Sequence, residues 1–364
     1  MLTESLVANQ ISEMQEIVRS NSCLLPRGAG SKSALQAVGQ SVTPLEMSAL
    51  RGMLEYQPQE FTFTALAGTP LGEIERLLAQ NGQYLPFDPP LVERAATLGG
   101  TVAAGLSGPG RYRFGGIRDF ILGVQFIDGR GELVRAGGKV VKNAAGFDLP
   151  KLMVGSLGGF GALVALSFKV FPLPQAFMTL RFHYESLSPA LEAITRLGCS
   201  PLEIFALELA LHECEANLLI RLGGDPRGFA ARRERLRLVL GCEAAEVLEN
   251  QPEREFWRRQ REFAWLDPAQ SLVKIPLPPR LAPALDERLA GRGAQRRYSA
   301  GANLAWVGWP GDLGDLDLPL KDMGLPALAV LGAASQVRLG ARLGAAFEAR
   351  VKQALDPAGK WLEL

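Results

Sequence analysis

The sequence predicts an α+β protein with more than one domain. Its 364 residues, 47% of them hydrophobic and 21% charged, suffice for two or three separate cores. Helix-like and strand-like segments alternate up to Phe171-Pro172-Leu173-Pro174, where the character of the sequence shifts. We expect one domain over residues 1–174, an α+β domain with an antiparallel sheet over 175–335, and a C-terminal helix within 336–364 that packs back on the first domain.

Apolar periodicity and end signals place the elements of the first domain. Helices are expected at 12–20, at 43–54, where Thr43 is the N-cap and Pro44 the first helical residue, and at 69–82, which repeats the Thr-Pro start. Strands are expected at 23–28 and 61–68, and the run 120–134 predicts a hairpin around Asp128-Gly129. The first 50 residues then form a small βαβ unit.

The second domain shows the same two kinds of pattern. Strands are expected at 179–184, 203–209, 216–223 and 271–278, and helices at 188–197, 226–240 and 252–267. A last helix, within 341–357, is closed by Pro357.

Composition and charge exclude several classes of function. A formal net charge of +1 leaves no basic surface for nucleic acid or an anionic membrane. The four cysteines lie far apart and form no zinc or iron–sulfur pattern, so we expect no metal site. No signal peptide is visible, and the uncharged run 152–168 contains four glycines and is short for a membrane span. We expect a cytoplasmic protein.

One stretch of the sequence contains very few large side chains. Residues 96–116, ATLGGTVAAGLSGPGRYRFGG, contain seven glycines. A flexible linker is excluded because Leu98, Val102 and Leu106 recur at fourfold spacing. Glycine both permits a positive φ and removes Cβ. The stretch is therefore either a tightly packed turn region or a backbone that a bulky ligand approaches closely.

A second glycine-rich turn follows a short apolar strand, at PRGAGSKS (26–33). It satisfies neither the Walker pattern GxxxxGK[ST] nor the Rossmann pattern GxGxxG. Such a turn can still present several N–H groups as an anion-binding nest. Taken alone, it could equally be an ordinary glycine-rich turn.

Several such segments follow one another in a fixed order. The segments after 26–33 are Gly-Thr-Pro (68–70), PFDP (86–89), 99–108, KNAAGFD (142–148) and GSLGGFG (155–161). In order and spacing they resemble the FAD-binding domain of the vanillyl-alcohol oxidase (PCMH) type, over residues 26–174. Within that type, GGTVAAGLSGPGRYRFGGIRDFILG and the run 139–174 resemble the E-subunit family of bacterial glycolate oxidases. The resemblance implies an FAD-binding domain of two α/β subdomains followed by an α+β cap domain.

The resemblance also implies which residues hold FAD. The 27–32 turn and the 99–108 segment would contact the pyrophosphate, Thr101 and Ser107 could donate hydroxyls, and main chain from Gly161 to Val164 could face the adenine. Asp119 would fix Arg118 or a turn, although both could instead form a surface ion pair. The expected cofactor residues are Arg27, Gly28, Ala29, Gly30, Ser31, Lys32, Pro86, Gly99, Gly100, Thr101, Ala104, Gly105, Ser107, Gly108, Arg118, Asp119, Gly161 and Val164.

The sequence departs from the family in its histidines. Only His183 and His212 occur, both beyond the FAD domain, so FAD is expected to be bound non-covalently. The His-rich HxGDGNxH-like segment of the sister D subunit is absent, and no catalytic residue is identified. Trp257, Arg261 and Lys274 are candidates for binding a substrate carboxylate, or else ordinary helix and surface residues.

The expected function follows from the resemblance. The chain would be the FAD-binding subunit of a glycolate oxidase complex, with a catalytic D-type flavoprotein and an iron–sulfur F-type subunit as partners. Its substrate would be a small 2-hydroxy acid. Two alternatives stay open: a self-contained flavin oxidase or reductase acting on a sugar or alcohol, and a scaffold subunit without catalysis.

Overall fold

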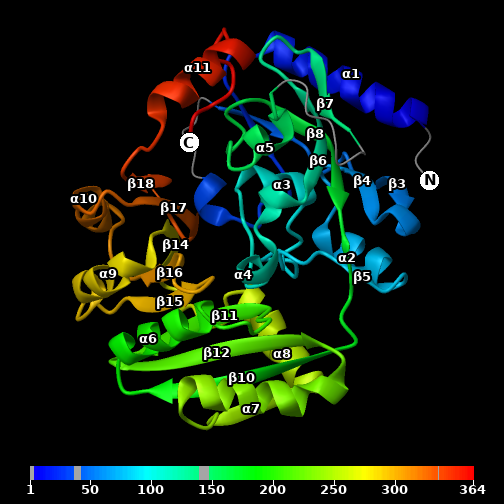
Figure 1. Cartoon of the computed structure of the whole chain (residues 1–364). Coiled ribbons are helices and arrows are strands. Elements are labelled where there is room, and N and C mark those ends of the chain that lie inside the picture. The colour runs from blue at the N-terminus through cyan, green and yellow to red at the C-terminus, as the bar shows by residue number, and fades with distance from the viewer. Residues whose placement is uncertain (1–3, 37–41, 139–146, 335) are drawn as a thin grey trace.

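The computed structural model describes residues 4–36, 42–138, 147–334 and 336–364. Two antiparallel sheets organise the chain (Figure 1). A five-stranded sheet, in the order β3-β4-β8-β6-β7, lies in the upper half of the view. A nine-stranded sheet, in the order β13-β10-β12-β11-β15-β16-β14-β17-β18, runs along the bottom and left. We call the described residues up to Pro174 the first unit, and residues 175–340 the second unit.

The first unit begins with a long helix and a two-stranded parallel sheet. Its helices and strands are α1 (Glu4–Ser20), β1 (Leu24–Arg27), β2 (Thr43–Glu46), β3 (Met53–Gln57), β4 (Thr62–Leu66), α2 (Leu71–Ala79), β5 (Gln83–Tyr84), α3 (Leu98–Ala103), α4 (Arg111–Phe114), β6 (Ile121–Ile127), β7 (Leu133–Gly137), α5 (Leu149–Met153), β8 (Ala162–Lys169) and β9 (Phe171–Pro172). The predicted hairpin is confirmed, because Ile127 of β6 pairs with Leu133 of β7.

The helix expected at 43–54 is wrong. Residues Thr43–Glu46 form strand β2, which pairs in parallel with β1, and Met53 begins strand β3. The apolar residues Leu45, Met47 and Leu50 do face a common core, as the helical spacing suggested, but they reach it from a strand and the turn after it. Pairing with β1 overrode the local Thr-Pro helix signal. The expected βαβ unit is therefore wrong: the segment expected as its helix is the strand that pairs in parallel with β1, and the expected strand at 61–68, β4, lies in the five-stranded sheet.

The second unit is a sheet with helices packed on it. Its elements are β10 (Ala176–Tyr184), α6 (Leu187–Gly198), β11 (Ala206–His212), β12 (Glu215–Gly224), α7 (Phe229–Leu240), β13 (Glu246–Glu249), α8 (Asn250–Arg261), β14 (Ser271–Pro276), α9 (Ala282–Leu289), β15 (Gln295–Ser299), β16 (Leu304–Trp309), α10 (Gly314–Asp322), β17 (Pro326–Leu331) and β18 (Arg338–Gly340). Helices α6, α7, α9 and α10 share one large core with the sheet. Helix α8 packs separately, with Trp257 against Ala206 and Leu219.

The two units share a core and several polar contacts. Leu272, Trp306 and Val330 of the nine-stranded sheet belong to the same apolar cluster as the residues packed on the five-stranded sheet. Ion pairs add to this contact, because Arg261 lies 2.6 Å from Glu75 and Arg221 lies 3.6 Å from Asp88. The second unit is therefore held against the first by apolar and charged contacts together.

The last helix, α11 (Ala345–Leu355), returns to the first unit (Figure 1). Lys352 Nζ donates a hydrogen bond of 2.9 Å to the carbonyl oxygen of Gly159, and Trp361 pairs with Leu24 of β1. In the part of the chain that the structure describes, no helix is long and apolar enough to span a bilayer.

Candidate cofactor site

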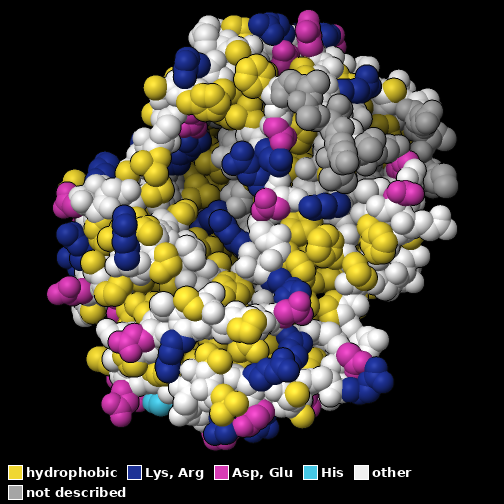
Figure 2. All heavy atoms as spheres, in the orientation of Figure 1, with side chains coloured by type: hydrophobic (Ala, Val, Ile, Leu, Met, Phe, Trp, Pro, Cys, Tyr) yellow, Lys and Arg dark blue, Asp and Glu magenta, His cyan; other side chains and the backbone are white. Residues whose placement is uncertain are grey.

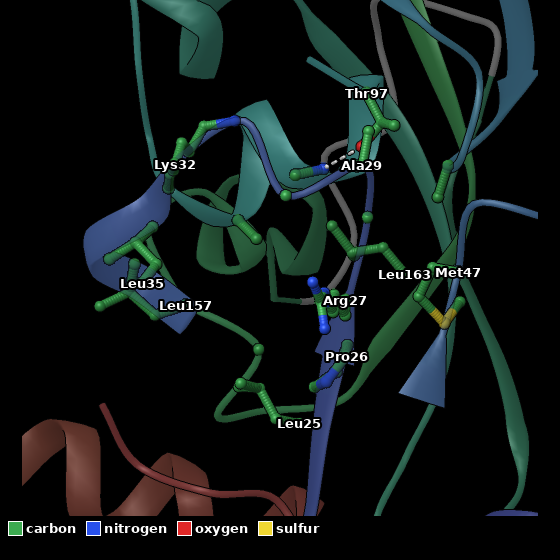
Figure 3. A pocket seen from close by; sticks show the side chains of 18 of the residues that line it. Leu25, Pro26, Arg27, Ala29, Lys32, Leu35, Met47, Thr97, Leu157 and Leu163 are labelled. Carbon is green, nitrogen blue, oxygen red and sulfur yellow. Dashed lines mark hydrogen bonds between the residues drawn. The ribbon is translucent and has the colours of Figure 1, made fainter. Parts of the chain in front are cut away.

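A cleft in the first unit brings the two glycine-rich segments together. We call it the loop pocket, and its empty volume is about 800 Å³. In Figure 3, Lys32, Leu35 and Leu157 lie at the left of the pocket, and Met47 and Leu163 lie at the right. Its lining residues are Leu25, Pro26, Arg27, Gly28, Ala29, Gly30, Ser31, Lys32, Leu35, Gln36, Met47, Ala67, Thr97, Gly99, Gly100, Ala103, Ala104, Leu157, Gly158, Gly161, Leu163 and Leu364.

The turn after β1 supplies unused donors to this pocket. Gly30 has a φ of +74°, a conformation that favours glycine. The main-chain N–H groups of residues 28–32 donate no hydrogen bond to any described residue. Buried or half-buried main-chain donors are normally paired, so a run of free N–H groups along a pocket wall indicates a place for an acceptor.

Lys32 adds a cation to the same wall. The side chain is 6% exposed, and its ammonium donates a 3.2 Å hydrogen bond to the Ser31 hydroxyl. Within the described chain it has no carboxylate partner, and burial lowers its pKa to about 8. A buried cation without a counter-charge is costly, and an anion in the pocket would remove that cost.

Helix α3 contributes space rather than donors. The Gly99 N–H donates to the carbonyl of Ala67 at 2.7 Å, and the Gly100 N–H donates to the Thr97 hydroxyl at 3.2 Å. A Cβ on Gly100 would stand 3.0 Å from that hydroxyl and 3.7 Å from Lys32 Nζ. The glycines of residues 96–116 therefore serve both packing and space. Gly99 is needed for packing on Ala67, and Gly100 leaves room beside Lys32.

A second hollow, the basic cleft, continues from the loop pocket toward the second unit. Ala104 and Leu157 line both. Figure 2 shows this hollow, with Lys and Arg side chains on its walls, between the side that carries α11, β17 and β18 and the side that carries α3 and α5. Its lining includes Gly105, Ser107, Arg111, Arg118, Asp119, Gly155, Lys274, Arg338, Arg342 and Glu348, and its empty volume is about 1310 Å³.

Lys274 is one of the cations that the second unit supplies to the basic cleft. Its ammonium donates a 2.7 Å hydrogen bond to the carbonyl of Gly105. Burial, together with the nearby charge of Arg111, lowers the pKa of Lys274 to about 8. Arg111 and Arg118 have no ion-pair partner among the residues described, whereas Arg338 is paired with Glu348 at 2.6 Å. The cleft therefore carries an excess of positive charge on both of its walls.

The remaining expected cofactor residues lie behind these walls. Thr101 is fully buried, and its hydroxyl has no hydrogen-bond partner in the described part of the chain. Val164 is buried in β8, where its carbonyl accepts from Ala67. Gly108 packs against the 86–89 turn, because a Cβ there would lie 2.0 Å from the Asp88 carbonyl oxygen. Pro86 belongs to that same turn and lines neither the loop pocket nor the basic cleft.

Two further expectations concern the basic cleft. The Ser107 hydroxyl accepts a hydrogen bond of 2.9 Å from the Ile117 N–H and donates its own proton to no described residue. Asp119 fixes a turn, since its carboxylate accepts from the Gly116 N–H at 2.8 Å. Of the KNAAGFD segment, residues 142–146 lie outside the described residues.

The three candidate substrate residues do not come together. Trp257 is 3% exposed and donates its indole N–H to the Thr179 hydroxyl at 2.7 Å. Arg261 is paired with Glu75, and both arginine and tryptophan line a different cleft, between α2 and α8. Only Lys274 lines the basic cleft. Fourfold spacing on a helix placed Trp257 and Arg261 near each other but could not indicate which cleft they face.

Sequence reasoning missed several lining residues. Arg111 lies inside the quoted glycine-rich stretch and could have been singled out as its first cation. The apolar walls formed by Leu35, Met47, Leu157 and Leu163 carry no local signal, because they are ordinary apolar positions until the fold gathers them. The described ranges contain no group of three His, Cys, Asp or Glu side chains placed to bind a metal ion.

Known proteins match both the sequence and the fold. Residues 6–137 match the family described as FAD binding domain. The chain is 37% identical over 297 residues to glycolate oxidase subunit GlcE of Escherichia coli (strain K12). This alignment covers 79% of this chain and 79% of that subunit. The fold and the loop pocket thus define a protein with an FAD binding domain. More particularly, the chain belongs to the family of glycolate oxidase subunit GlcE, whose members are subunits of FAD-dependent oxidoreductases.

More distant relatives share part of the chain. D-lactate dehydrogenase of Anaerostipes hadrus is 26% identical over 57% of this chain, and glycolate oxidase subunit GlcD of Bacillus subtilis (strain 168) is 28% identical over 47%. The matches span only 44% and 37% of those two proteins. A solved structure of alkyldihydroxyacetonephosphate synthase superposes with a TM-score of 0.70 at 15% identity, covering 96% of this chain and 73% of that chain. This likeness confirms the expected α+β fold.

Proposed function

We propose that this chain holds one FAD non-covalently and works as the FAD-binding subunit of a complex that oxidises a small 2-hydroxy acid, with glycolate as substrate and glyoxylate as product. The observation that carries the proposal is the loop pocket. There a buried Lys32, which has no carboxylate partner among the described residues, lies beside the main-chain N–H groups of residues 28–32, which donate to no described residue.

The residues of the pocket fit the pyrophosphate of FAD. Its anionic oxygens accept several hydrogen bonds at once, which a nest of N–H groups provides better than single side chains do. Lys32 supplies the opposite charge, and the absence of a Cβ at Gly100 leaves space next to its ammonium. The apolar residues Leu35, Leu157 and Leu163 suit the remainder of a large, partly aromatic cofactor.

The placement of the histidines supports non-covalent binding. His183 lies on β10 and His212 on β11, and neither lines the loop pocket or the basic cleft. A covalent link through either imidazole would require the nine-stranded sheet to reach the pocket from its far strands.

The basic cleft suits the substrate. A 2-hydroxy acid carries a carboxylate, and Lys274 and Arg111 present cations from opposite walls of the cleft that adjoins the loop pocket. When bound, FAD supplies a two-electron acceptor for the hydrogen of the hydroxyl-bearing carbon. The chain's own residues bind and orient the acid there. No histidine lines the described part of the cleft, and general base assistance is worth roughly 10²- to 10⁴-fold in rate. We therefore expect the isolated chain to oxidise glycolate weakly or not at all.

Partner subunits complete the proposed activity. Membership of the GlcE family supports a D-type flavoprotein and an iron–sulfur F-type subunit as partners that take the electrons onward. Affinity capture of the chain from its native host, followed by mass spectrometry, should recover a second flavoprotein and a cysteine-rich iron–sulfur protein. Recovery of this chain alone, together with rapid glycolate-dependent bleaching of its flavin and reoxidation by dissolved oxygen, would contradict the proposal and indicate an autonomous oxidase.

A further inference from the structure

Another cavity lies wholly within the second unit. It shares no lining residue with the loop pocket or the basic cleft, and its empty volume is about 1120 Å³. We call it the sheet pocket. Its lining residues are Arg181, Ala210, Leu211, His212, Glu213, Asn217, Leu219, Phe256, Gln260, Trp265, Ala294, Gln295, Arg296 and Arg297.

Strand register creates the floor of the sheet pocket. Asn217 of β12 pairs with Ala210 of β11, and Ala210 pairs with Arg297 of β15. These three residues thus stand in one row across adjacent strands, and their side chains lie on the same face of the sheet. The methyl group of Ala210 leaves a gap between an amide and a guanidinium. Helix α8 and Trp265 form the wall beside this gap.

Arg297 is held in place with most of its donors unused. Its Nη1 donates a 2.6 Å hydrogen bond to Gln260, and its guanidinium lies 4.8 Å from the ring centroid of Trp265. Gln295 fixes Trp265 in turn, by donating to its carbonyl oxygen at 3.0 Å. A guanidinium has five N–H donors, and that of Arg297 forms no other hydrogen bond with the residues that the structure describes.

The charge around the sheet pocket is not balanced at Arg297. Arg181 is paired with Glu246 at 2.9 Å, and Arg296 lies 3.2 Å from Asp286. Arg297 has no carboxylate within ion-pair distance in the described part of the chain. Burial lowers the pKa of Arg297 to about 10, an effect that the charge of Glu208 opposes and that of Arg181 reinforces. Glu208 is not within ion-pair distance, so a carboxylate in the pocket would be a closer counter-charge.

We propose that the sheet pocket binds a small organic acid, whose carboxylate is gripped by Arg297 and whose carbon skeleton rests on Trp265 and Phe256. The side-chain amide of Asn217, which forms no hydrogen bond with a described residue, offers a further donor. Arginine beside a fixed aromatic ring recognises a planar carboxylate well, since the fork of N–H groups matches the two oxygens. This site is separate from the one proposed for the oxidised 2-hydroxy acid.

Isothermal titration calorimetry tests the proposal with benzoate and its neutral isostere benzamide. We expect benzoate to bind at least about tenfold more tightly than benzamide, which corresponds to about 1.4 kcal/mol. Arg297→Gln should abolish this difference, because it removes the charge and keeps hydrogen-bonding groups. Arg235→Gln, on the exposed face of α7, is the matched control and should leave benzoate binding unchanged.

Lys274→Met separates this site from the basic cleft. If benzoate occupies the sheet pocket, its affinity is unchanged in this variant. Loss of benzoate binding in Lys274→Met but not in Arg297→Gln would overturn the proposal, as would equal affinities for benzoate and benzamide. Asn217→Leu, which fills the gap in the floor, provides a second variant in case Arg297→Gln does not fold, and it should also lower benzoate affinity at least about tenfold.

Discussion

Lys274 of strand β14 donates a 2.7 Å hydrogen bond to the carbonyl oxygen of Gly105, two residues after helix α3 ends. One hydrogen bond therefore joins the second unit to the glycine-rich stretch that lines the loop pocket. The same ammonium lies in the basic cleft, where it keeps further donors for a ligand. This contact places the ammonium that we propose to bind substrate next to the backbone proposed to lie along FAD.

Replacing Lys274 with methionine should weaken binding of small organic acids in the basic cleft, glyoxylate among them, without loss of FAD. Charge-assisted hydrogen bonds contribute about 1.5–3 kcal/mol, so the dissociation constant for glyoxylate should rise about 10- to 100-fold. The measurement is titration of the flavin absorbance of the isolated, FAD-loaded chain. Arg280→Gln, an exposed cation of the same unit, is the control. Unchanged glyoxylate affinity in Lys274→Met would exclude the lysine from the substrate site.

Gly100→Leu should abolish FAD uptake while the fold survives. A Cβ at this position already comes within 3.0 Å of the Thr97 hydroxyl, and the longer leucine side chain would extend toward Lys32 in the loop pocket. The measurement is the ratio of flavin to protein after purification, with circular dichroism as the check on folding. Gly198→Leu, where a Cβ meets nothing within 4 Å, is the matched control and should retain full flavin. Full flavin content in Gly100→Leu would show that the pocket is misassigned.

The affinity for FAD should fall as pH rises above about 8. Burial lowers the pKa of Lys32 to about 8, so the empty pocket loses its cation near that pH, whereas a bound pyrophosphate favours the charged form. At pH 9 the affinity should be lower than at pH 7 by up to about tenfold. Equilibrium dialysis at the two pH values measures this change.

Two variants identify the titrating group. Lys32→Met should bind FAD weakly at both pH values and lose the pH dependence, whereas Lys274→Met, which removes the other lysine with a pKa of about 8, should keep it. The stability of the FAD-free protein should change with pH in the opposite direction to its affinity for FAD. Its unfolded state holds the lysine proton up to about pH 10.5, so its stability should rise between pH 8 and 10.5. The same pH dependence of FAD affinity in Lys32→Met would contradict the assignment.

Glu253→Ala should destabilise the second unit. Glu253 is fully buried and accepts a 2.8 Å hydrogen bond from Arg221, whose other carboxylate neighbour, Asp88, lies 3.6 Å away. Removing one partner of a buried ion pair leaves an uncompensated charge and costs about 3 kcal/mol or more. Urea denaturation of the free chain measures the loss. Glu255→Ala on the same helix breaks only a half-exposed pair with Arg258, and should change the free energy of unfolding by less than about 1 kcal/mol. Equal effects of the two substitutions would contradict this account.

Local pattern predicted the helices α1, α2, α6, α7, α8 and α11 and the β6–β7 hairpin, but none of the helices and strands between Ala282 and Gly340. The family resemblance, rather than local pattern, implied that the turn at 27–32 and the segment 99–108 hold one cofactor, and residues of both line the loop pocket. The different roles of the two segments could not be predicted. Only the fold shows that the N–H groups of Gly99 and Gly100 already donate hydrogen bonds, while those of residues 28–32 donate to no described residue. The strand at Thr43–Glu46 was missed because its partner, β1, lies 19 residues earlier in the chain.

The substrate side was harder to predict than the cofactor side. Lys274 and Arg111 are far apart in sequence and meet only because β14 packs against the first unit. Arg261 looked like a carboxylate binder on its helix, but Glu75 of helix α2 already pairs with it. Interactions of this kind depend on how the two units pack, which no short pattern encodes.

The absorption spectrum of the purified chain, followed by acid precipitation, tests the central claim most directly. The account predicts flavin bands in the near-ultraviolet and visible, close to one FAD per chain, and release of all the flavin into the acid supernatant. Flavin that stays with the precipitated protein would contradict non-covalent binding. A chain that has no flavin bands and takes up none from added FAD would contradict the cofactor site itself.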